Sequence, residues 1–468
     1  MSKRQAAAPA PGLLEAFAQT FDPLFGKLNQ REGFRRYLEG LLLPTERNKT
    51  LTGLANTEPG VGAQEARAQS LQWYLSESDW DEGVLNQRRV ELLVKEPSTA
   101  PNAGGALVID ETGDLKDGSH TAHVGRQYLG KVGKIDNGVV SVSSLWADER
   151  VYYPLEVEPY TPAAWFERGS ANPAFRTKLA LALDLVQRAV QAHLPFKAVV
   201  ADCFYGEDRT LRSGLQQLGV GYVMALKPSH SWRHRVDDLG SLEEVAHATP
   251  WGGSKQAGAW LAVDRTFRDG HTERWWALEV VAGPYGPHRA LRAVVVTTDP
   301  LNLPALTTWY LITNLPAPHT PRAENSPLSA APLAEIVRLY GLRTWVEQSY
   351  KQVKTTLGWA QYQVRSDRAI RRHWLLVFCA FTFCWWQAGQ NRADRLLATD
   401  PALQPTSTPI TGQSQGQKKP GRVSGSAQSG LARRLTSGPK LARTSYHAQA
   451  LLAGLLGPAP AAIHSAPS

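Results

Sequence analysis

The sequence predicts an α/β fold, in which a mixed sheet with packed helices follows a small helical domain and takes up a β-rich insertion. Three observations support this prediction. Apolar residues recur at helical three-and-four spacing up to about residue 97. From Gly104 onward, short apolar runs alternate with strongly periodic stretches, the pattern of strands and helices that share a sheet. After residue 228, two apolar runs flank Asp269-Gly270, which is a hairpin signal.

The composition narrows the class of protein. A chain of 468 residues with 43% hydrophobic residues can build several packed domains, and its net charge of +9 points to an anionic partner. Three cysteines provide no disulfide framework, and the N-terminus lacks the apolar run of a signal peptide. The longest apolar stretch, Trp374 to Trp386, is too short to span a bilayer. We therefore expect a cytoplasmic protein without a membrane partner, and not a secreted, membrane or fibrous one.

Residues 1–100 are predicted to form the helical N-terminal domain. Its four candidate helices lie at 13–17, 34–42, 64–76 and 83–94. An acid between Ser78 and Glu82 can cap the last of them, and Pro97 closes the region. A domain that binds DNA ends through a helix-turn-helix fits this pattern. A helical bundle with no DNA role fits it as well and is favoured by about two to one.

Residues 101–227 and 307–390 are predicted to form two parts of one α/β core. In the first part the expected order is strand, strand, strand, helix, strand, helix, strand. These elements lie at 106–110, 138–146, 151–157, 177–194, 196–202, 208–218 and 221–226. Residues 228–306 are the β-rich insertion, after which a strand at 309–314 and a helix from Leu333 to about Leu357 resume the core.

Residues 391–468 are predicted to be a basic low-complexity tail. From Gln390 on, nine Lys and Arg residues stand against two acidic residues, so this part carries seven of the nine net positive charges. Its first half is rich in Pro, Gly, Ser, Thr and Gln, as linkers are. A loose phosphate-binding arm and a solvated tail without a role are equally good interpretations.

A near match to a phosphate-binding P-loop, Gly125 to Val132, is rejected. Val132 stands where a Ser or Thr should reach the metal, no clear strand precedes the motif, and no helix follows it. We therefore interpret its glycines as turn residues.

Two acids have a placement that suits metal binding. Asp110 and Asp202 each end an apolar strand, where a packed core can hold a carboxylate rigidly toward a metal. Acids also commonly follow strands as turn formers. For either residue alone, the turn is the better interpretation.

The helix predicted from Leu333 to Leu357 carries a third acid. Its polar stripe, with steps of three and four residues, consists of Tyr340, Arg343, Glu347, Lys351 and Lys354. Taken alone, the stripe is best explained as a solvated face with ion pairs among Arg343, Glu347 and Lys351, each worth a few tenths of a kcal/mol.

Taken together, these residues resemble the DDE transposases of cut-and-paste insertion sequences. The pattern Tyr340-x2-Arg343-x3-Glu347-x6-Lys354 matches the signature helix of that family, and the three acids stand in the family's order. The stretches 110–118, 125–128 and 201–206 look like insertion-sequence family 701 in particular. Glu111 departs from the pattern because a second Asp is expected there, but a carboxylate is retained. The resemblance spans roughly residues 30–390.

The resemblance implies an RNase H-like sheet that carries a metal-dependent transposase site. Its catalytic residues would be Asp110, Asp202 and Glu347. These acids would hold two Mg²⁺ or Mn²⁺ ions about 4 Å apart, because hard cations prefer carboxylate oxygens and two-metal sites have that spacing. The substrates would be double-stranded transposon ends and target DNA, acted on at the nucleoid. A homodimer is implied because two ends must be brought together.

The resemblance also implies a set of DNA-binding residues: Tyr340, Arg343, Lys351, Lys354 and, on the insertion, Trp275 and Trp276. Trp275 and Trp276 are adjacent on a predicted strand, so one is expected to face the core and the other not. The outward one would stack on a base flipped from the DNA end. A second Trp packed against the main sheet is favoured over this interpretation by about two to one.

Three other functions remain open. A plain metal-dependent nuclease of the same fold would lack only the strand-transfer step. A non-catalytic DNA-binding protein derived from a transposase would need no acids, and drift is not expected to spare all three. A two-carboxylate glycosidase would have no need of the basic stripe or the basic tail.

Overall fold

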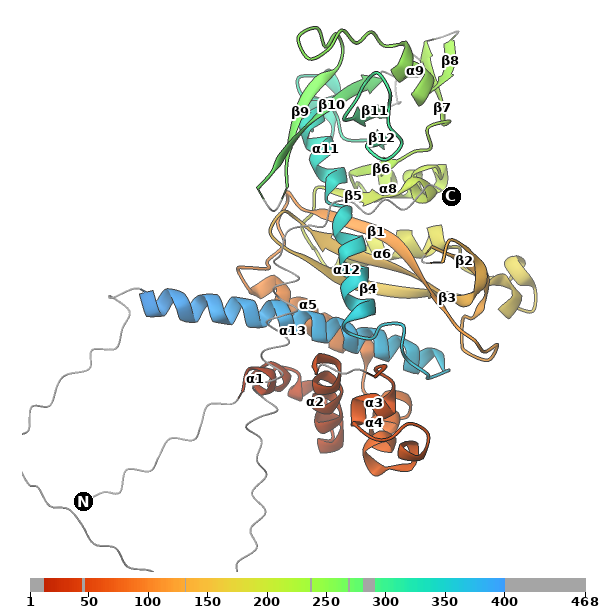
Figure 1. Cartoon of the computed structure of the whole chain (residues 1–468), viewed down its shortest axis with the longest axis vertical. Helices are drawn as coiled ribbons and strands as arrows, with labels where there is room; N and C mark the ends of the chain where they lie inside the picture. Colours follow the sequence, from red (N-terminus) through yellow and green to blue (C-terminus); the bar gives the residue numbers. More distant parts are fainter. Residues whose placement is uncertain are drawn as a thin grey trace, which may run out of the picture.

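The computed structural model describes residues 12–43, 47–130, 132–235, 238–267, 270–280 and 291–399. In these residues a helical unit lies against a large mixed sheet (Figure 1). The helices are α1 (Leu13–Gln19), α2 (Leu28–Leu42), α3 (Leu51–Ala55), α4 (Ala66–Ser76), α5 (Glu82–Lys95), α6 (Lys178–Gln191), α7 (Cys203–Gly206), α8 (Arg209–Gln217), α9 (Leu242–Ala248), α10 (Pro321–Asn325), α11 (Leu333–Gly341), α12 (Thr344–Thr355) and α13 (Asp367–Thr399). The basic tail predicted for 391–468 lies outside the described residues from position 400 onward.

The described strands form a ten-stranded sheet in the order β2-β3-β1-β5-β6-β12-β11-β10-β9, with β4 paired to β3. They are β1 (Ala106–Leu115), β2 (Gly125–Leu129), β3 (Lys134–Ala147), β4 (Tyr152–Tyr160), β5 (Ala198–Ala201), β6 (Tyr222–Ala225), β9 (Leu261–Thr266), β10 (Thr272–Val280), β11 (Arg292–Thr297) and β12 (Thr308–Thr313); β7 (Ser231–Arg235) and β8 (Asp238–Ser241) pair separately. Because β5 runs parallel to β1 and β6 while the other pairs are antiparallel, the predicted mixed sheet is confirmed.

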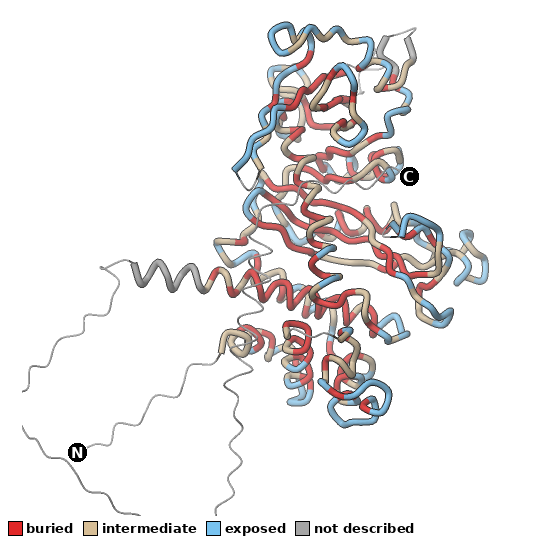
Figure 2. The backbone as a smooth tube through the Cα atoms, in the orientation of Figure 1, coloured by how far each residue is buried: buried red, intermediate tan, exposed pale blue. Residues whose placement is uncertain are grey.

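Helices cover both faces of the sheet around β1. Successive strand residues point to opposite faces, and the side chains of two neighbours on β1 follow this rule. Asp110 contacts Arg343 at the start of α12, whereas Glu111 contacts Lys178 at the start of α6. Thus α12 and α6 lie on opposite faces, and the central strands β5 and β6 are apolar and buried because both of their sides are covered (Figure 2).

The β-rich insertion predicted at 228–306 extends the main sheet. Its strands β9, β10 and β11 continue the sheet beyond β12 and end at the edge strand β9. The hairpin signal is confirmed, because β9 and β10 pair in register from Leu261↔Ala277 to Thr266↔Thr272. The segment therefore supplies one end of the sheet on which the catalytic residues were predicted to lie.

Two predicted element boundaries were wrong. Asp110 does not end its strand, since β1 continues to Leu115 by pairing with β3. The single helix predicted from Leu333 to Leu357 is divided into α11 and α12 at Leu342 and Arg343. There the backbone hydrogen bonds tighten to three-residue spacing, as in Arg343 N to Tyr340 O at 3.0 Å. Gly341, a weak helix former, stands just before this turn.

The rejected P-loop motif also contains a strand that the sequence interpretation missed. Gly125–Leu129 forms β2, which pairs with β3 along its whole length. The interpretation of Gly125 as a turn residue was therefore wrong.

The helical unit is built from both ends of the described chain. The predicted buried helix at 374–386 is the central part of α13, which packs against α2, α4, α5 and β4. The ring of Phe17 lies 5.4 Å from that of Phe383, and Arg372 donates to the carbonyls of Leu75, Ser78 and Trp80. The predicted division at residues 390 and 391 falls inside α13. None of the described helices is both long and apolar enough to cross a membrane.

His373 makes the stability of the helical unit dependent on pH. It is buried on α13, where Tyr37 O–H donates to its Nδ1 at 2.8 Å and its Nε2 donates to Gly358 O at 3.1 Å. Burial lowers the pKa of His373 to about 4, below the value of about 6.5 in an unfolded chain. Between about pH 6.5 and about pH 4, His373 is protonated in the unfolded chain but stays neutral in the folded chain. The free energy of unfolding therefore falls as the pH drops from about 6.5 to about 4.

We expect His373 to account for a loss of about 3 kcal/mol over this range. Urea unfolding of the wild type and of His373→Gln, followed by helical circular dichroism, measures this contribution as the difference between two pH dependences. Equal pH dependences for the two proteins would contradict a buried neutral imidazole.

Candidate active site

Asp110 lies on β1 where its parallel neighbour ends. β5 pairs with β1 from Ala198 to Val200, opposite Ala106 to Val108. Continuing this register places Asp202 beside Asp110, so the two acids come from adjacent strands. The Asp110 side chain is only 10% exposed, and its Oδ1 accepts a hydrogen bond from the backbone N–H of Glu111 at 2.9 Å. This carboxylate is therefore held by a packed strand.

Asp202 follows β5 and caps the short helix α7. Its Oδ1 accepts a hydrogen bond from the backbone N–H of Phe204 at 3.0 Å, the contact that an acid makes at a helix start. Asp202 thus has the turn-forming role that is common for an acid after a strand. One oxygen is fixed by the cap, and the other, Oδ2, lies 3.9 Å from Arg343. The cap and the site use different oxygens.

Arg343 brings the three predicted acids together. Its Nη2 lies 3.4 Å from Asp110 Oδ2 as well as 3.9 Å from Asp202 Oδ2. Its Nη1 donates to Glu347 Oε1, one turn along α12, at 3.2 Å. Three carboxylates from three elements therefore surround one guanidinium. The third nitrogen of the guanidinium, Nε, is buried and has no hydrogen-bond partner among the described residues.

Burial and crowded charges set the protonation of this site. Burial raises the pKa of Asp110 to about 7, although Arg343 opposes the rise, and the carboxylate of Asp202 adds to it. Burial acts to lower the pKa of Arg343, but the surrounding acids, Asp110 first, outweigh it and raise that pKa above its usual value. Arg343 is thus a permanent cation among acids that repel one another.

The donor chemistry of the three acids fits a divalent metal. Carboxylate oxygens are the ligands that Mg²⁺ prefers, and here they already converge on a positive charge. Among the described residues, no three or more His, Cys, Asp and Glu side chains form a group that could hold a metal ion as they stand. The guanidinium of Arg343 contacts all three acids instead.

The remaining residues of the predicted polar stripe have different surroundings. Tyr340 lies in the last turn of α11, and its ring centre is 5.0 Å from that of Trp309; burial raises its pKa to about 12. Lys351 is exposed on α12 and makes no ion pair with a described residue. Lys354 is paired already, because its Nζ lies 2.7 Å from Asp114 Oδ1 and donates to Gly113 O at 3.0 Å.

The Lys354–Asp114 pair is buried, with side chains 11% and 4% exposed. We expect Lys354→Met to reduce the free energy of unfolding by about 3–5 kcal/mol, since it leaves the carboxylate of Asp114 buried without its cation. Asp114→Asn in addition should recover most of that loss. Denaturant unfolding of the single and double variants measures the coupling. A loss of DNA affinity without a loss of stability in Lys354→Met would show that the lysine serves DNA and not the fold.

Trp275 and Trp276 are both buried, so the expectation that one of them avoids the core was wrong. They do point to opposite faces of β10, as alternation requires. Trp275 packs against Trp309 with ring centroids 4.6 Å apart, and Trp276 meets Trp251 at 4.5 Å. The sheet is covered on both faces at this point. A base-stacking role for either Trp stays a prediction and would require it to leave these contacts.

Two contact groups near the acids were missed by sequence reasoning. On the face of β1 opposite to Asp110, Glu111 accepts from Lys178 at 2.6 Å and from Tyr205 O–H at 3.4 Å. Their sequence signal was the retained carboxylate at position 111. These two contacts of Glu111 hold α6 and α7 against β1, the strand that carries Asp110.

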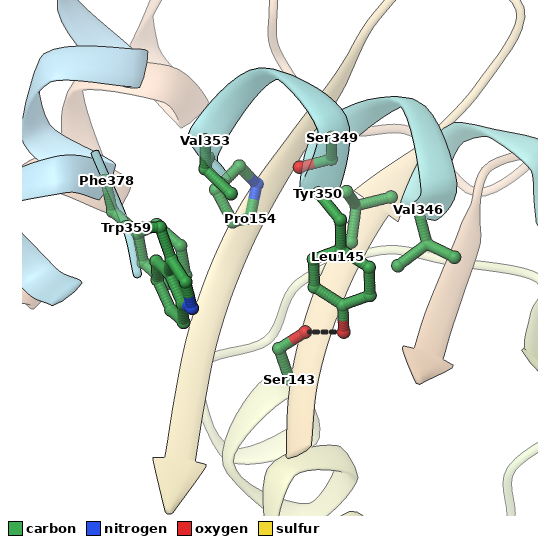
Figure 3. Close-up of a pocket in the computed structure, with 9 residues that line it drawn as sticks. All are labelled: Ser143, Leu145, Pro154, Val346, Ser349, Tyr350, Val353, Trp359 and Phe378. Atoms are coloured by element: carbon green, nitrogen blue, oxygen red, sulfur yellow. Dashed lines mark hydrogen bonds between the residues drawn. The ribbon is translucent and has the colours of Figure 1, made fainter. Parts of the chain in front are cut away.

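The second missed group lies beneath α12. The hydroxyl oxygens of Tyr350 and Ser143 are 2.6 Å apart. Ser143 lies on β3, where it pairs with Asp110 of β1. Tyr350 and Ser143 border a cavity of about 10 Å³ between α12 and the strands β3 and β4 (Figure 3). Its other walls are mainly apolar: Leu145, Pro154, Val346, Val353, Trp359 and Phe378. A space that would hold about one water is a packing gap and not a substrate site.

Comparisons with known proteins identify the family of this chain. The family described as DDE superfamily endonuclease matches residues 20–276, which include β1 and β5 and hence Asp110 and Asp202 but not Glu347. A protein of Microchaete diplosiphon described as "Probable transposase for insertion sequence element IS701" is 32% identical over 365 residues, covering 78% of this chain and 85% of the relative. The chain therefore belongs to the DDE superfamily endonucleases, in the group of insertion-sequence transposases that contains the IS701 relative.

Proposed function

We propose that this chain excises an insertion sequence and joins it to new DNA, with Asp110, Asp202 and Glu347 as its catalytic residues. The observation that carries the proposal is the convergence of these acids, from β1, the turn between β5 and α7, and α12, on the guanidinium of Arg343. A structural ion pair needs one acid for one arginine. Three acids crowded around one arginine, with the pKa of Asp110 raised by burial, have the character of a functional site.

Endonucleases of this superfamily use divalent metal ions, and we propose two Mg²⁺ ions, or Mn²⁺ in their place, held by the three acids. Bound there, such ions would activate the attacking oxygen and stabilise the leaving oxygen of a phosphodiester. The chain's own contribution is to hold the carboxylate oxygens on packed elements. Arg343 would move from the acids to a DNA phosphate, which offers its guanidinium a bidentate anionic partner.

The proposed reaction consists of two phosphoryl transfers. In the first, a water oxygen bonds to the phosphorus at the end of the element, and the bond from phosphorus to the 3′ oxygen breaks. The products are a 3′-hydroxyl and a 5′-phosphate. In the second, that 3′-hydroxyl oxygen attacks a phosphorus of the opposite strand or of the target, and another 3′ oxygen leaves.

Lys351 is the cation of the stripe that is free to meet DNA without breaking a buried pair. It is exposed on the same helix as Glu347, so a duplex at the acids would pass close to it. We further propose that the active complex is a homodimer, since two ends of one element must be cut together. Light scattering of the chain bound to terminal DNA would then give the mass of two chains.

Incubation with the terminal DNA of its own element tests this function. With Mg²⁺ present, we expect cuts at the element ends, followed by covalent joining of those ends to a target plasmid. A plain nuclease would give cuts without joined products. Binding without cuts in Mg²⁺ or Mn²⁺ would instead identify a non-catalytic DNA-binding protein.

A further inference from the structure

Arg265 lies on the edge strand β9 and is surrounded by aromatic rings. Its guanidinium carbon is 4.6 Å from the ring centre of Trp275, 4.5 Å from that of Trp309 and 4.8 Å from that of Phe267. A Cβ atom built at Gly341 would lie 2.9 Å from Arg265 Nη2. The side chain therefore reaches from the end of the sheet to the turn between α11 and α12, where Arg343 stands.

Among the described residues, no acid forms an ion pair with this arginine, although Glu273 lies opposite it across β9 and β10. Within the described parts of the chain, neither a carboxylate nor a carbonyl is within hydrogen-bond or ion-pair distance of Arg265, and the nearby Glu273 is engaged with Trp275 Nε1 at 3.0 Å and His271 at 3.5 Å. Burial lowers the pKa of Arg265 to about 10, while Glu273 acts to raise it, so the group remains charged at neutral pH. None of its nitrogens is among the buried unpaired atoms, and they therefore keep contact with solvent.

Such an arrangement is costly unless an anion uses it. Desolvating a charge without a partner opposes folding, and the cation–π contacts return only part of that cost. The matched residue on the same hairpin shows the usual solution: Arg274 is paired with Asp264 at 2.7 Å, and both side chains are more than half exposed. Arg265 is instead held among aromatic rings, and its N–H groups have no hydrogen-bond partner in the part of the chain that the structure describes.

The position of Arg265 relates it to the acids. Trp309 contacts both Arg265 and Tyr340, with 5.0 Å between the centres of the Trp309 and Tyr340 rings. Tyr340 is followed three residues later by Arg343, which contacts the three acids. Arg265, Trp309, Tyr340 and Arg343 are thus successive neighbours that lead to the acids. Helix α11, which carries Tyr340, contacts β9 and β10 and lies beside them in Figure 1.

We propose that Arg265 binds a phosphate of the DNA backbone, at the place where a duplex cut at the acids continues toward β9. The inference rests on the proposed function, because it assumes that DNA occupies the acid site. Arg265 is a binding residue in this account and not a catalytic one. Its contact is to the backbone, so it should contribute equally for every DNA sequence.

The test compares Arg265→Gln, Arg265→Lys and the control Arg274→Gln with the wild-type chain. Each binds a duplex of unrelated sequence without divalent metal, over a series of salt concentrations. We expect Arg265→Gln to weaken binding and to reduce the slope of log K against log salt by about 0.9, the loss of one phosphate contact. Arg265→Lys should keep the slope, and Arg274→Gln should match the wild type. Equal slopes for wild type and a folded Arg265→Gln would overturn the proposal.

Neutral methylphosphonates placed singly along the duplex give a second measurement. The wild type should lose affinity at one phosphate where Arg265→Gln loses none. If Arg265→Gln does not fold, Arg265→Met decides, because its apolar stem keeps contact with the rings but carries no charge: lost sensitivity at one phosphate supports the contact, and an identical profile at every position overturns it. Because these assays contain no metal and measure no cleavage, their failure leaves the catalytic assignment standing, whereas absence of wild-type DNA binding would refute the proposed function itself.

Discussion

Asp110→Asn, Asp202→Asn and Glu347→Gln are each expected to abolish Mg²⁺-dependent cleavage and strand transfer. A bound metal contributes several kcal/mol of transition-state stabilisation, and each 1.36 kcal/mol is a factor of ten in rate. The loss of one ligand should therefore reduce the rate by about 10³-fold or more. DNA binding should persist or rise, because a negative charge near the phosphates is removed. Cleavage assays with terminal DNA and binding assays on the same preparations separate the two effects.

The fold should tolerate these three changes. Burial disfavours the charged form of Asp110 and so raises its pKa. Above about pH 7, replacing this carboxylate by the neutral amide of Asn therefore removes a buried charge and should not destabilise the fold. A suitable control is Asp184→Asn, which lies on α6 and pairs with Arg176; it should cleave as the wild type does. Wild-type cleavage by any one acid variant would remove that residue from the site, and cleavage by all three would refute the site as a whole.

Arg343→Gln is expected to tighten the binding of Mg²⁺ to the DNA-free chain by at least about tenfold. The guanidinium lies 3.2 to 3.9 Å from all three acids, where a unit charge is worth about 4 kcal/mol per pair at an effective dielectric of about 20. Without it, the acids are left with only a metal to neutralise them. The same variant should bind DNA more weakly and cleave less, since the proposed phosphate contact is lost. Isothermal titration with Mg²⁺ measures the first effect.

Lys351→Gln provides the matched control for this measurement. Lys351 is a cation on the same helix, but it is exposed and contacts none of the three acids. Its substitution should weaken DNA binding while leaving the metal affinity unchanged. If Arg343→Gln binds Mg²⁺ no more tightly than Lys351→Gln does, Arg343 is not a competitor of the metal.

The positions of the acids along the sequence were informative because local patterns determine them. An apolar run followed by Asp202 predicts a strand and its end, and β5 is found there. Asp110 was misplaced within its strand, since the continuation of β1 to Leu115 depends on pairing with β3, a long-range contact that no local pattern contains. The adjacency of the two acids likewise follows from the register between β1 and β5, which only the folded chain defines.

Features that depend on packing could not be predicted from the sequence. Trp275 and Trp276 alternate as expected, but their burial requires Trp309 and Trp251, which come from separate segments. The stripe on α11 and α12 was predicted as a row of ion pairs within one helix. Of the pairs considered among Arg343, Glu347 and Lys351, the described residues form Arg343 with Glu347, and Arg343 also contacts Asp110 and Asp202.

We propose that Asp110, Asp202 and Glu347 surround one divalent-metal site, and metal-directed cutting of the protein chain tests this arrangement most directly. Fe²⁺ in place of Mg²⁺, with ascorbate and peroxide, generates radicals that cut the backbone close to the bound metal. With terminal DNA bound, we predict cuts in three separate segments, on β1 near Asp110, at the start of α7 near Asp202 and on α12 near Glu347, all suppressed by excess Mg²⁺. Cuts confined to one of these segments, or located elsewhere and unaffected by Mg²⁺, would contradict the shared site.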